Sequence, residues 1–330
     1  MATIKDVAAH AGVSLGTASR VLSGSAQTSA ASREKVLAAA AALDYVANGP
    51  ARSLRRSRTD VLGLLVSDIR NEFFAKLAHA AEQEARRLGF TVLLANADED
   101  QHQVDEYLRT FSSQRVDGLL LAPQGELTAQ LSGLAASGLP LVLMNRSLDG
   151  LDAPMIGTDN SGGVAAVLEW LQQRGHRDVA FVGGPPSIST GAERMRTYLT
   201  GREAYGITTD SAFVDTGDFR EEGAAEAMTR ILERGARPTA VFGANGRTTQ
   251  GAYRALREFF GVETAAGIEI VSFDDLEWFQ FAHPPISAVR NDAETIGRLG
   301  VRALVDLVEG RSAESARVPT SFVDRGQVPA

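Results

Sequence analysis

The sequence predicts a small all-helical head followed by a larger two-lobed α/β body, with parallel sheets covered by helices. Three observations lead to this expectation. Short amphipathic helical patterns fill the chain up to Tyr45, whereas from residue 61 near-continuous apolar runs alternate with amphipathic stretches. Such alternation is typical of parallel sheets buried on both faces. Of the 330 residues, 44% are hydrophobic, which is enough for a large core and more than one domain.

The charge is distributed unevenly along the chain. The net charge is −8, from 33 Lys and Arg against 41 Asp and Glu. Residues 1–58 contain eight basic and three acidic residues, a balance of +5, so the remaining residues carry −13. This asymmetry suggests a polyanion-binding head on an acidic body, although ordinary surface variation would also produce it.

Residues 3–22 form two short helical patterns around a Gly-Val-Ser turn. Thr3 and Ser14 are the expected N-caps, and Gly12 can take the positive φ that ends the first helix. The apolar faces at helical spacing are Ile4, Val7, Ala8 and Ala11 in the first helix and Ala18, Val21 and Leu22 in the second. A third helix over residues 32–43 is expected to cover them through Val36, Leu37, Ala40 and Leu43.

Two short helices around a tight glycine turn are typical of a helix-turn-helix. The second helix must be slim to enter a major groove, which its small outer residues allow. Hydroxyls suit phosphate oxygens, and Arg20 can reach a guanine edge or a phosphate. A helical hairpin packed on another domain is the alternative. The expected DNA-binding residues of the head are Thr3, Ser14, Leu15, Gly16, Thr17, Ser19 and Arg20.

A short basic segment follows the helical patterns. It gathers three arginines around one large apolar residue, Leu54, so it cannot bury enough surface to fold alone. A helix capped by Asn48 that forms when its arginines meet phosphates fits this composition, and Leu54 could then wedge into a minor groove. A flexible basic linker is the alternative. The expected DNA-binding residues here are Asn48, Ala51, Arg52, Leu54 and Arg55.

The body alternates strand-like and helix-like segments. Apolar strand-like runs cover residues 61–68, 91–97, 118–123, 139–145, 178–184, 240–245 and 268–275, with a last strand at 320–326. Amphipathic stretches include residues 74–88, 102–114, 161–174, 220–235 and 247–259. No apolar run is long enough to span a bilayer, and charged residues interrupt the N-terminus where a signal peptide would need an apolar run, so we expect a soluble, cytoplasmic protein.

The run TIKDVAAHAGVSLGTASRVLSG and the later SREKVLAAAAALDYVANGPARSLRRSRTDVLGLLV resemble the LacI/GalR family of bacterial transcription regulators. The similarity continues through EFF, QRVDGLLLAP, GTDNSGG, RGHRDVAFVGGPP, GDF, PTAVFGAN, IEIVSFDD and PPISAVRND, in this order. The resemblance implies a ligand-responsive repressor that binds a palindromic operator as a homodimer. No strand or heptad segment follows residue 326, so a dimer is favoured over a tail-assembled tetramer.

The resemblance also implies the domain organisation. A helix-turn-helix domain would cover residues 1–47, a hinge helix 48–58, and a periplasmic-binding-protein-like core 59–330. Lobe 1 of this core would comprise about 59–159 and 292–319, and lobe 2 about 160–291 and 320–330. Effectors of the sugar type, acting as inducers, are favoured, whereas a purine or nucleoside co-repressor is the alternative that TGAER at 190–194 suggests.

Polar and aromatic residues gather where the predicted strands end, which is where open parallel sheets bind ligands. Aromatic rings cover the apolar face of a sugar or base, and carboxylates, amides and a guanidinium satisfy its polar rim. The resemblance implies that Arg194 grips the effector, that Asp274 faces it and that Phe219 covers it. The expected effector-binding residues are Asp68, Phe73, Phe74, Asn145, Asp159, Thr190, Arg194, Phe219, Asn245 and Asp274.

Two other classes of protein remain as alternatives. An enzyme would need a catalytic set, and HRDV at 176–179 lacks the Gly-rich loop and lysine that would accompany a kinase-type site. There is no cysteine, and the histidines show no metal-ligand spacing, so we expect no metal and no cofactor. A transported-solute binding protein would need an export signal where the basic head stands.

Overall fold

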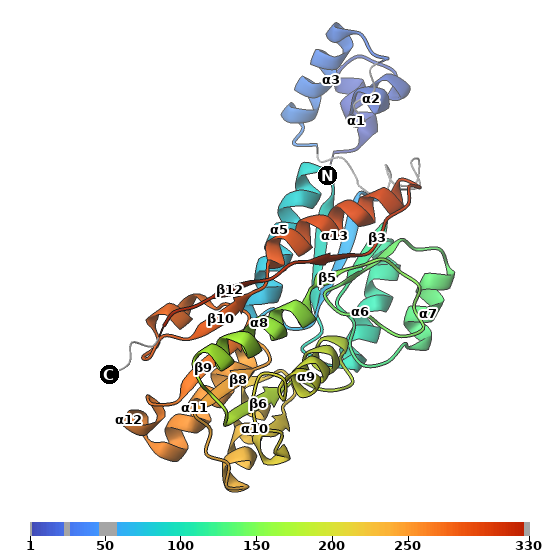
Figure 1. The fold of residues 1–330 in the computed structure, drawn as a ribbon. Helices are drawn as coiled ribbons and strands as arrows, with labels where there is room; N and C mark the ends of the chain where they lie inside the picture. The colour runs from blue at the N-terminus through green and yellow to red at the C-terminus, as the bar shows by residue number, and fades with distance from the viewer. Residues whose placement is uncertain (1, 23–26, 46–57, 327–330) are drawn as a thin grey trace. The chain divides into compact units, whose positions relative to one another are not determined.

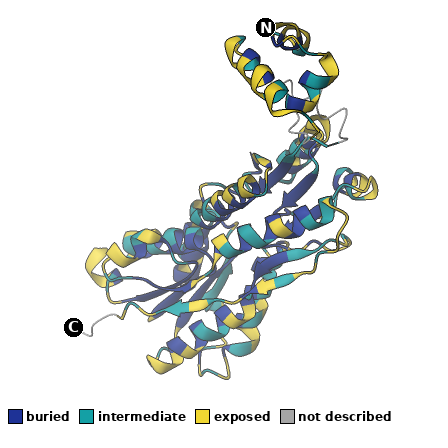
Figure 2. Ribbon diagram, turned by 90° about the horizontal axis from the view of Figure 1, so that it is seen from above, coloured by how far each residue is buried: buried dark blue, intermediate teal, exposed yellow. Residues whose placement is uncertain are grey.

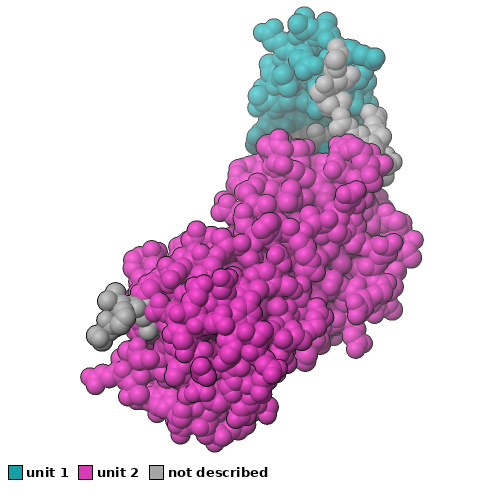
Figure 3. Space-filling model, in the orientation of Figure 1, with its two compact units in different colours: residues 1–60 teal, residues 61–330 magenta. Residues whose placement is uncertain are grey.

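The computed structural model describes residues 2–22, 27–45 and 58–326 (Figure 1). The chain divides into two compact units, Met1–Asp60 and Val61–Ala330, which Figure 3 distinguishes by colour. Within the described residues, no helix is long and apolar enough to cross a membrane.

The first unit is a cluster of three helices: α1 (Ile4–His10), α2 (Leu15–Leu22) and α3 (Ala30–Ala42). Its core residues are Val7, Ala8, Ala11, Ala18, Val21, Val36 and Ala39. Helix α3 begins two residues earlier than predicted because the Ser29 side chain accepts a hydrogen bond from the Ser32 backbone N–H and caps it. The prediction for Leu37 was wrong: it is 52% exposed. Position 37 lies about 100° around the helix from Val36, and Ala39 takes the buried place.

The second unit contains two six-stranded sheets. The first has the strand order β11-β5-β4-β3-β1-β2, and all of its pairs are parallel. Its strands are β1 (Val61–Val66), β2 (Thr91–Asn96), β3 (Gly118–Leu121), β4 (Leu141–Met144), β5 (Met155–Thr158) and β11 (Ala316–Val318). Helices α5 (Glu72–Arg87) and α13 (Ala293–Val308) pack together against one face, and α6 (Gln101–Gln114) and α7 (Ala129–Ala136) cover the other.

The second sheet has the order β12-β10-β9-β8-β6-β7 and is parallel except for the pair β10–β12. Its strands are β6 (Val179–Gly183), β7 (Val214–Thr216), β8 (Ala240–Gly243), β9 (Glu269–Phe273), β10 (Ser287–Arg290) and β12 (Ser321–Val323). Helices α8 (Asn160–Gln173) and α9 (Ser189–Gly201) pack on one face. The other face is covered by α10 (Glu221–Glu233), α11 (Gly246–Phe260) and the short α12 (Val262–Ala265). Figure 2 shows the buried strands between partly exposed helices.

The chain passes between the two sheets three times: from β5 into α8, from β10 into α13, and from β11 into β12. All seven apolar runs that the pattern singled out are strands. Strands β5, β7, β10 and β11 were not predicted from the pattern, because each has only three or four residues and no continuous apolar run. The last strand is shorter than predicted and covers only Ser321–Val323.

Candidate functional site

Helix α2 presents the outer face that the sequence analysis assigned to DNA. Ala18 and Val21 are buried, whereas Leu15 is 43% exposed and Gly16 and Arg20 are exposed. The Arg20 Nε donates to the Gly16 carbonyl oxygen at 3.2 Å, so its guanidinium lies back along the helix. A Cβ at Gly16 would stand 4.0 Å from the Arg20 Nη2. Because Gly16 has no side chain, the Arg20 guanidinium can occupy the surface beside it.

Two of the hydroxyl side chains assigned to DNA, Thr3 and Ser14, form hydrogen bonds within the head. The Thr3 Oγ1 accepts from the Asp6 backbone N–H at 3.4 Å, and the Asp6 carboxylate accepts from the Thr3 backbone N–H at 2.7 Å, which forms a capping box at α1. These bonds lower the pKa of Asp6. The Ser14 Oγ accepts from the Thr17 backbone N–H at 3.1 Å and caps α2. Asn48, Ala51, Arg52, Leu54 and Arg55 lie outside the described residues and stay predictions.

Eight of the ten candidate effector residues line one pocket between the two sheets. They follow the carboxyl ends of β4, β7, β8 and β9 or lie in the first half of α5 and α9, where parallel strands place ligand sites. The cavity measures about 10 Å³, roughly the space of one water molecule. The pocket residues are Asn71, Phe73, Phe74, Asn145, Arg146, Thr190, Arg194, Phe219, Asn245 and Asp274.

Arg194, on α9, lines this pocket and is buried. Its Nε donates to the Asn160 Oδ1 at 2.8 Å, its Nη1 donates to the Ala244 carbonyl oxygen at 2.6 Å, and the guanidinium lies 3.6 Å from the Phe273 ring centroid. Burial lowers its pKa to about 10, and the nearby Asp274 carboxylate works in the opposite direction. Arg194 therefore stays charged near neutral pH and is fixed in position before any ligand arrives.

Asp274 follows β9 with a positive φ of 77° and is also buried. Burial raises its pKa, whereas the positive charge of Arg194 and a hydrogen bond from the Asn291 Nδ2 at 3.3 Å lower it. The carboxylate is thus an acceptor held opposite a guanidinium. Together the two groups can bind a ligand that offers both a donor and an acceptor, such as a pair of neighbouring hydroxyls.

Arg146 and Asn71 line the pocket but were missed by the sequence analysis. The Arg146 guanidinium lies 5.5 Å from the ring centroids of both Phe74 and Phe219. It follows Asn145 at the end of β4, which was the available signal, because the same argument had selected Asn145. The Asn71 side chain caps α5 and the Asn245 side chain caps α11, each through a bond to a backbone N–H.

Asp68 and Asp159 do not line this pocket. The Asp68 carboxylate accepts from the Arg70 backbone N–H and Nε, both at 2.9 Å. The Asp159 carboxylate accepts from the Gly162 backbone N–H at 2.9 Å and caps α8. Both carboxylates are used in local turns, which is the ordinary structural role of an aspartate after a strand.

Backbone strain is concentrated around the pocket. Eight described residues other than glycine have a positive φ, and four of them belong to this site or pair with one of its residues: Glu99, Asn145, Phe219 and Asp274. Such conformations cost about 1–3 kcal/mol each and persist where the surrounding structure holds them. The Phe219 ring packs against Gly184, at which a Cβ would come within 2.1 Å of it. The strained backbone therefore sets the direction of side chains that line the pocket.

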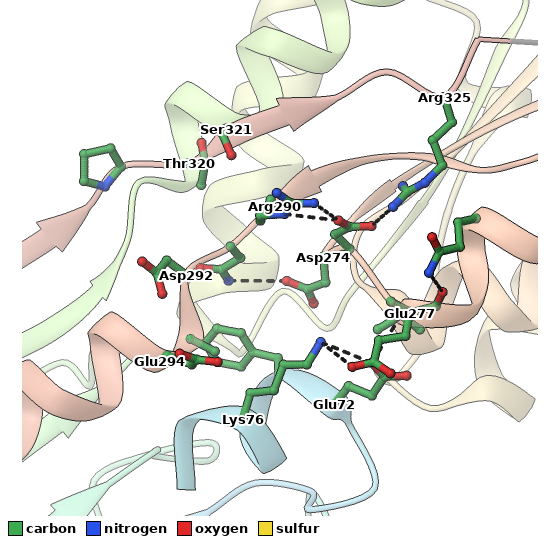
Figure 4. Close-up of a pocket in the computed structure, with 17 residues that line it drawn as sticks. Glu72, Lys76, Asp274, Glu277, Arg290, Asp292, Glu294, Thr320, Ser321 and Arg325 are labelled. Carbon is green, nitrogen blue, oxygen red and sulfur yellow. Dashed lines mark hydrogen bonds and ion pairs between the residues drawn. The ribbon is translucent and has the colours of Figure 1, made fainter. Parts of the chain in front are cut away.

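A second cavity of about 710 Å³ adjoins this pocket and shares Phe73 and Asp274 with it (Figure 4). Its walls come from α5 and from the segments where the chain crosses between the sheets. Lys76 on α5 lies 3.5 Å from Glu72 and 3.8 Å from Glu277, so it links the two lobes. The lobes also meet where the Ser147 backbone N–H donates to the Ser189 Oγ at 2.9 Å. The pocket has room for about one water molecule, so a sugar-sized ligand requires the lobes or side chains to move.

Two family models match the chain, one over the head and one over the body. "Bacterial regulatory proteins, lacI family" matches residues 3–48, and "Periplasmic binding proteins and sugar binding domain of LacI family" matches residues 59–325. This chain belongs to the LacI family. The predicted resemblance and fold class, a helix-turn-helix head and a two-lobed parallel α/β core, are thereby confirmed.

Relatives of known name agree with this assignment along the whole chain. The transcriptional repressor PurR of Proteus mirabilis is 32% identical, covering 99% of this chain and 97% of its own. The ribose operon repressor of Escherichia coli is 28% identical, covering 99% of both. A lac repressor dimer bound to operator and an anti-inducer matches with a TM-score of 0.85 at 27% identity, covering 98% of both chains. The regulator CelR in complex with cellobiose matches with a TM-score of 0.71 at 31% identity, covering 98% of this chain and 99% of its own.

The predicted function is confirmed at the level of the family. The chain is a LacI-family, ligand-responsive transcriptional repressor.

Proposed function

We propose that the chain binds a palindromic operator as a homodimer and releases it when a small polyhydroxylated effector enters the pocket between the lobes. In this proposal residues 1–47 read the major groove, residues 48–58 bind the minor groove, and residues 59–330 bind the effector and the partner subunit. The observation that carries it is the pocket itself, where Arg194, Asp274 and two aromatic rings converge at the strand ends of both sheets.

In this proposal the small size of the pocket couples the two sites. Arg146 from one lobe and Phe219 from the other lie against each other there, so an effector larger than one water molecule enters by changing how the lobes meet. Residues 48–58 closely precede β1 in the sequence, and in this proposal a shift between the lobes changes how the two hinge segments of the dimer pair. Coupling of about 1–3 kcal/mol is typical of such linkage and changes operator affinity roughly 5- to 150-fold.

We favour an inducer of the sugar type over a purine co-repressor. Arg194 and Asp274 offer one donor and one acceptor group that suit neighbouring hydroxyls, and the rings of Phe74 and Phe219 suit the apolar face of a sugar. A purine or nucleoside co-repressor is the alternative, since TGAER at 190–194 suggests it and relatives named transcriptional repressor PurR match this chain. We assign the protein no catalytic step and place it in the cytoplasm, where its operator is.

The experiment is an operator-binding titration with the full-length protein. Duplexes selected from random sequence identify the preferred site, and sugars and nucleobases are then added one at a time. We expect a symmetric site, steep salt dependence and release by a neutral sugar. Tighter binding with a nucleobase would support the co-repressor instead. Equal affinity for selected and random DNA, with and without small molecules, would overturn the proposal.

A further inference from the structure

Arg146 lines the effector pocket, and a carboxylate already neutralises its charge. Its Nη1 donates to the Glu99 Oε2 at 2.9 Å and its Nη2 donates to the Glu99 Oε1 at 2.8 Å. The two side chains are only 4% and 9% exposed. This bidentate geometry is the strongest arrangement of a guanidinium with a carboxylate, and low exposure limits screening by solvent.

The pair stands where an effector ring would be held. The guanidinium lies against Phe74 from the first lobe and Phe219 from the second, 5.5 Å from each ring centroid. A ligand that enters between these rings therefore lies beside Arg146. Because both Nη atoms already donate to Glu99, what the ligand meets is a neutral pair rather than a free cation.

The other cations in and beside the pocket also have carboxylates near them. Arg194 has the buried Asp274 carboxylate close enough to oppose the effect of burial on its pKa. The adjoining cavity has more carboxylates than cations (Figure 4), so an anion in it would be repelled. Its carboxylates are Glu72, Asp274, Asp275, Glu277, Asp292 and Glu294, against Lys76, Arg290 and Arg325. In the described part of the chain no group of three or more of these acids is arranged to hold a metal ion.

We propose that Glu99 is a specificity-determining residue: by neutralising Arg146, it makes the pocket select neutral polyhydroxylated effectors and reject phosphorylated or carboxylated sugars. This inference rests on the proposed function, because it concerns the ligand of the same pocket. Its physical basis is the desolvation of the anion. A phosphate or carboxylate that leaves water for a buried site needs an unneutralised cation to compensate, and Glu99 removes the one nearest to the rings.

The test uses inorganic phosphate as the probe, so it does not depend on knowing the effector. Phosphate is titrated into the full-length wild type and into Glu99→Gln at low ionic strength, with binding measured by calorimetry. We expect no binding to the wild type and millimolar binding to Glu99→Gln, a gain of about tenfold or more, because Arg146 then has no carboxylate. Failure of folded Glu99→Gln to bind phosphate, or binding by the wild type that Arg146→Gln removes, would overturn the proposal.

Two further variants serve as controls for the phosphate-binding test. Glu269→Gln is the matched control, since it removes another buried carboxylate paired with an arginine, Arg174 at 2.7 Å, away from the pocket. It should not gain phosphate binding. The double variant Glu99→Gln, Arg146→Gln replaces the ion pair by two amides and should lose the gained binding. A gain that persists in the double variant would contradict the role of Arg146.

A ligand panel on the wild type covers the case in which Glu99→Gln does not fold. D-Glucose and D-ribose are compared with glucose 6-phosphate and ribose 5-phosphate by the shift in unfolding temperature. A shift with a phosphate ester and none with its neutral partner would refute the selectivity while leaving a ligand-responsive repressor intact. Failure of the proposed function would look different, because no bound ligand would then change operator affinity. A shift with the neutral sugar alone supports the inference.

Discussion

Arg194→Met is the substitution whose effect can be worked most fully from the structure. Arg194 donates two hydrogen bonds, to Asn160 and to the Ala244 carbonyl, and is buried against Phe273. A hydrogen bond to a charged group contributes about 1.5–3 kcal/mol, so two lost bonds correspond to about 3–6 kcal/mol. Methionine retains apolar contact with the ring and recovers part of this. We therefore expect a loss of roughly 3 kcal/mol in unfolding free energy, which a typical domain tolerates.

Arg194→Met should also weaken the effector response, independently of its effect on stability. Neither hydrogen bond uses the Nη2 atom, which remains for the polar rim of an effector. Loss of one charged hydrogen bond to the ligand, again about 1.5–3 kcal/mol, should raise the effector concentration for half-maximal operator release about 10- to 150-fold. Operator binding without effector should change little, because Arg194 lies in the effector-binding unit.

Denaturant unfolding and effector titration of operator release measure the two effects. Arg234→Met is a matched control in the same lobe: Arg234 pairs with Asp215 at 2.9 Å on the surface and should cost under about 1 kcal/mol with no change in response. A folded Arg194→Met variant that responds to the effector at the wild-type concentration would contradict the binding role of Arg194.

Three further outcomes are expected. Gly184→Ala should weaken the effector response and cost about 1–3 kcal/mol of stability, because the new Cβ would overlap the Phe219 ring; unchanged values in both assays would count against that packing. Effector affinity should fall as the pH drops through the raised pKa of Asp274, because protonation removes the anionic acceptor. The variant Asp274→Asn should bind the effector weakly at every pH. A wild-type affinity that does not change with pH down to the acid limit of folding would exclude this role. Leu54→Ala, outside the described residues, should lower affinity for the operator far more than for random DNA in a direct comparison, since a wedge contact exists only on the kinked site; equal losses on both would argue against the wedge.

Much of the site could be predicted because it depends on topology. Near-continuous apolar runs identify buried parallel strands, and the ends of such strands meet at one edge, so Asn145, Asn245 and Asp274 could be expected near one another. The same argument failed to place Asp68 and Asp159. Their carboxylates turn to neighbouring backbone N–H groups, a local choice that strand position does not determine.

Arg146 shows what the sequence could not supply. An arginine after a strand is ordinarily a surface residue, and its partner Glu99 is 47 positions away with a positive φ of 54°. Only the fold reveals that the two are paired between aromatic rings. In the head, Leu37 was misassigned because an alanine-rich helix offers few large side chains to define the buried face, and its hydrophobic pattern is weak.

The proposed release of the operator by the effector is tested most directly by measuring operator affinity with and without bound effector. The dissociation constant of the full-length protein for its symmetric operator is measured at fixed salt, first alone and then with saturating effector identified by thermal shift. We expect the effector to weaken operator binding roughly 5- to 150-fold, and Arg194→Met to need far more effector for the same change. The same dissociation constant with and without saturating effector would contradict the proposed release.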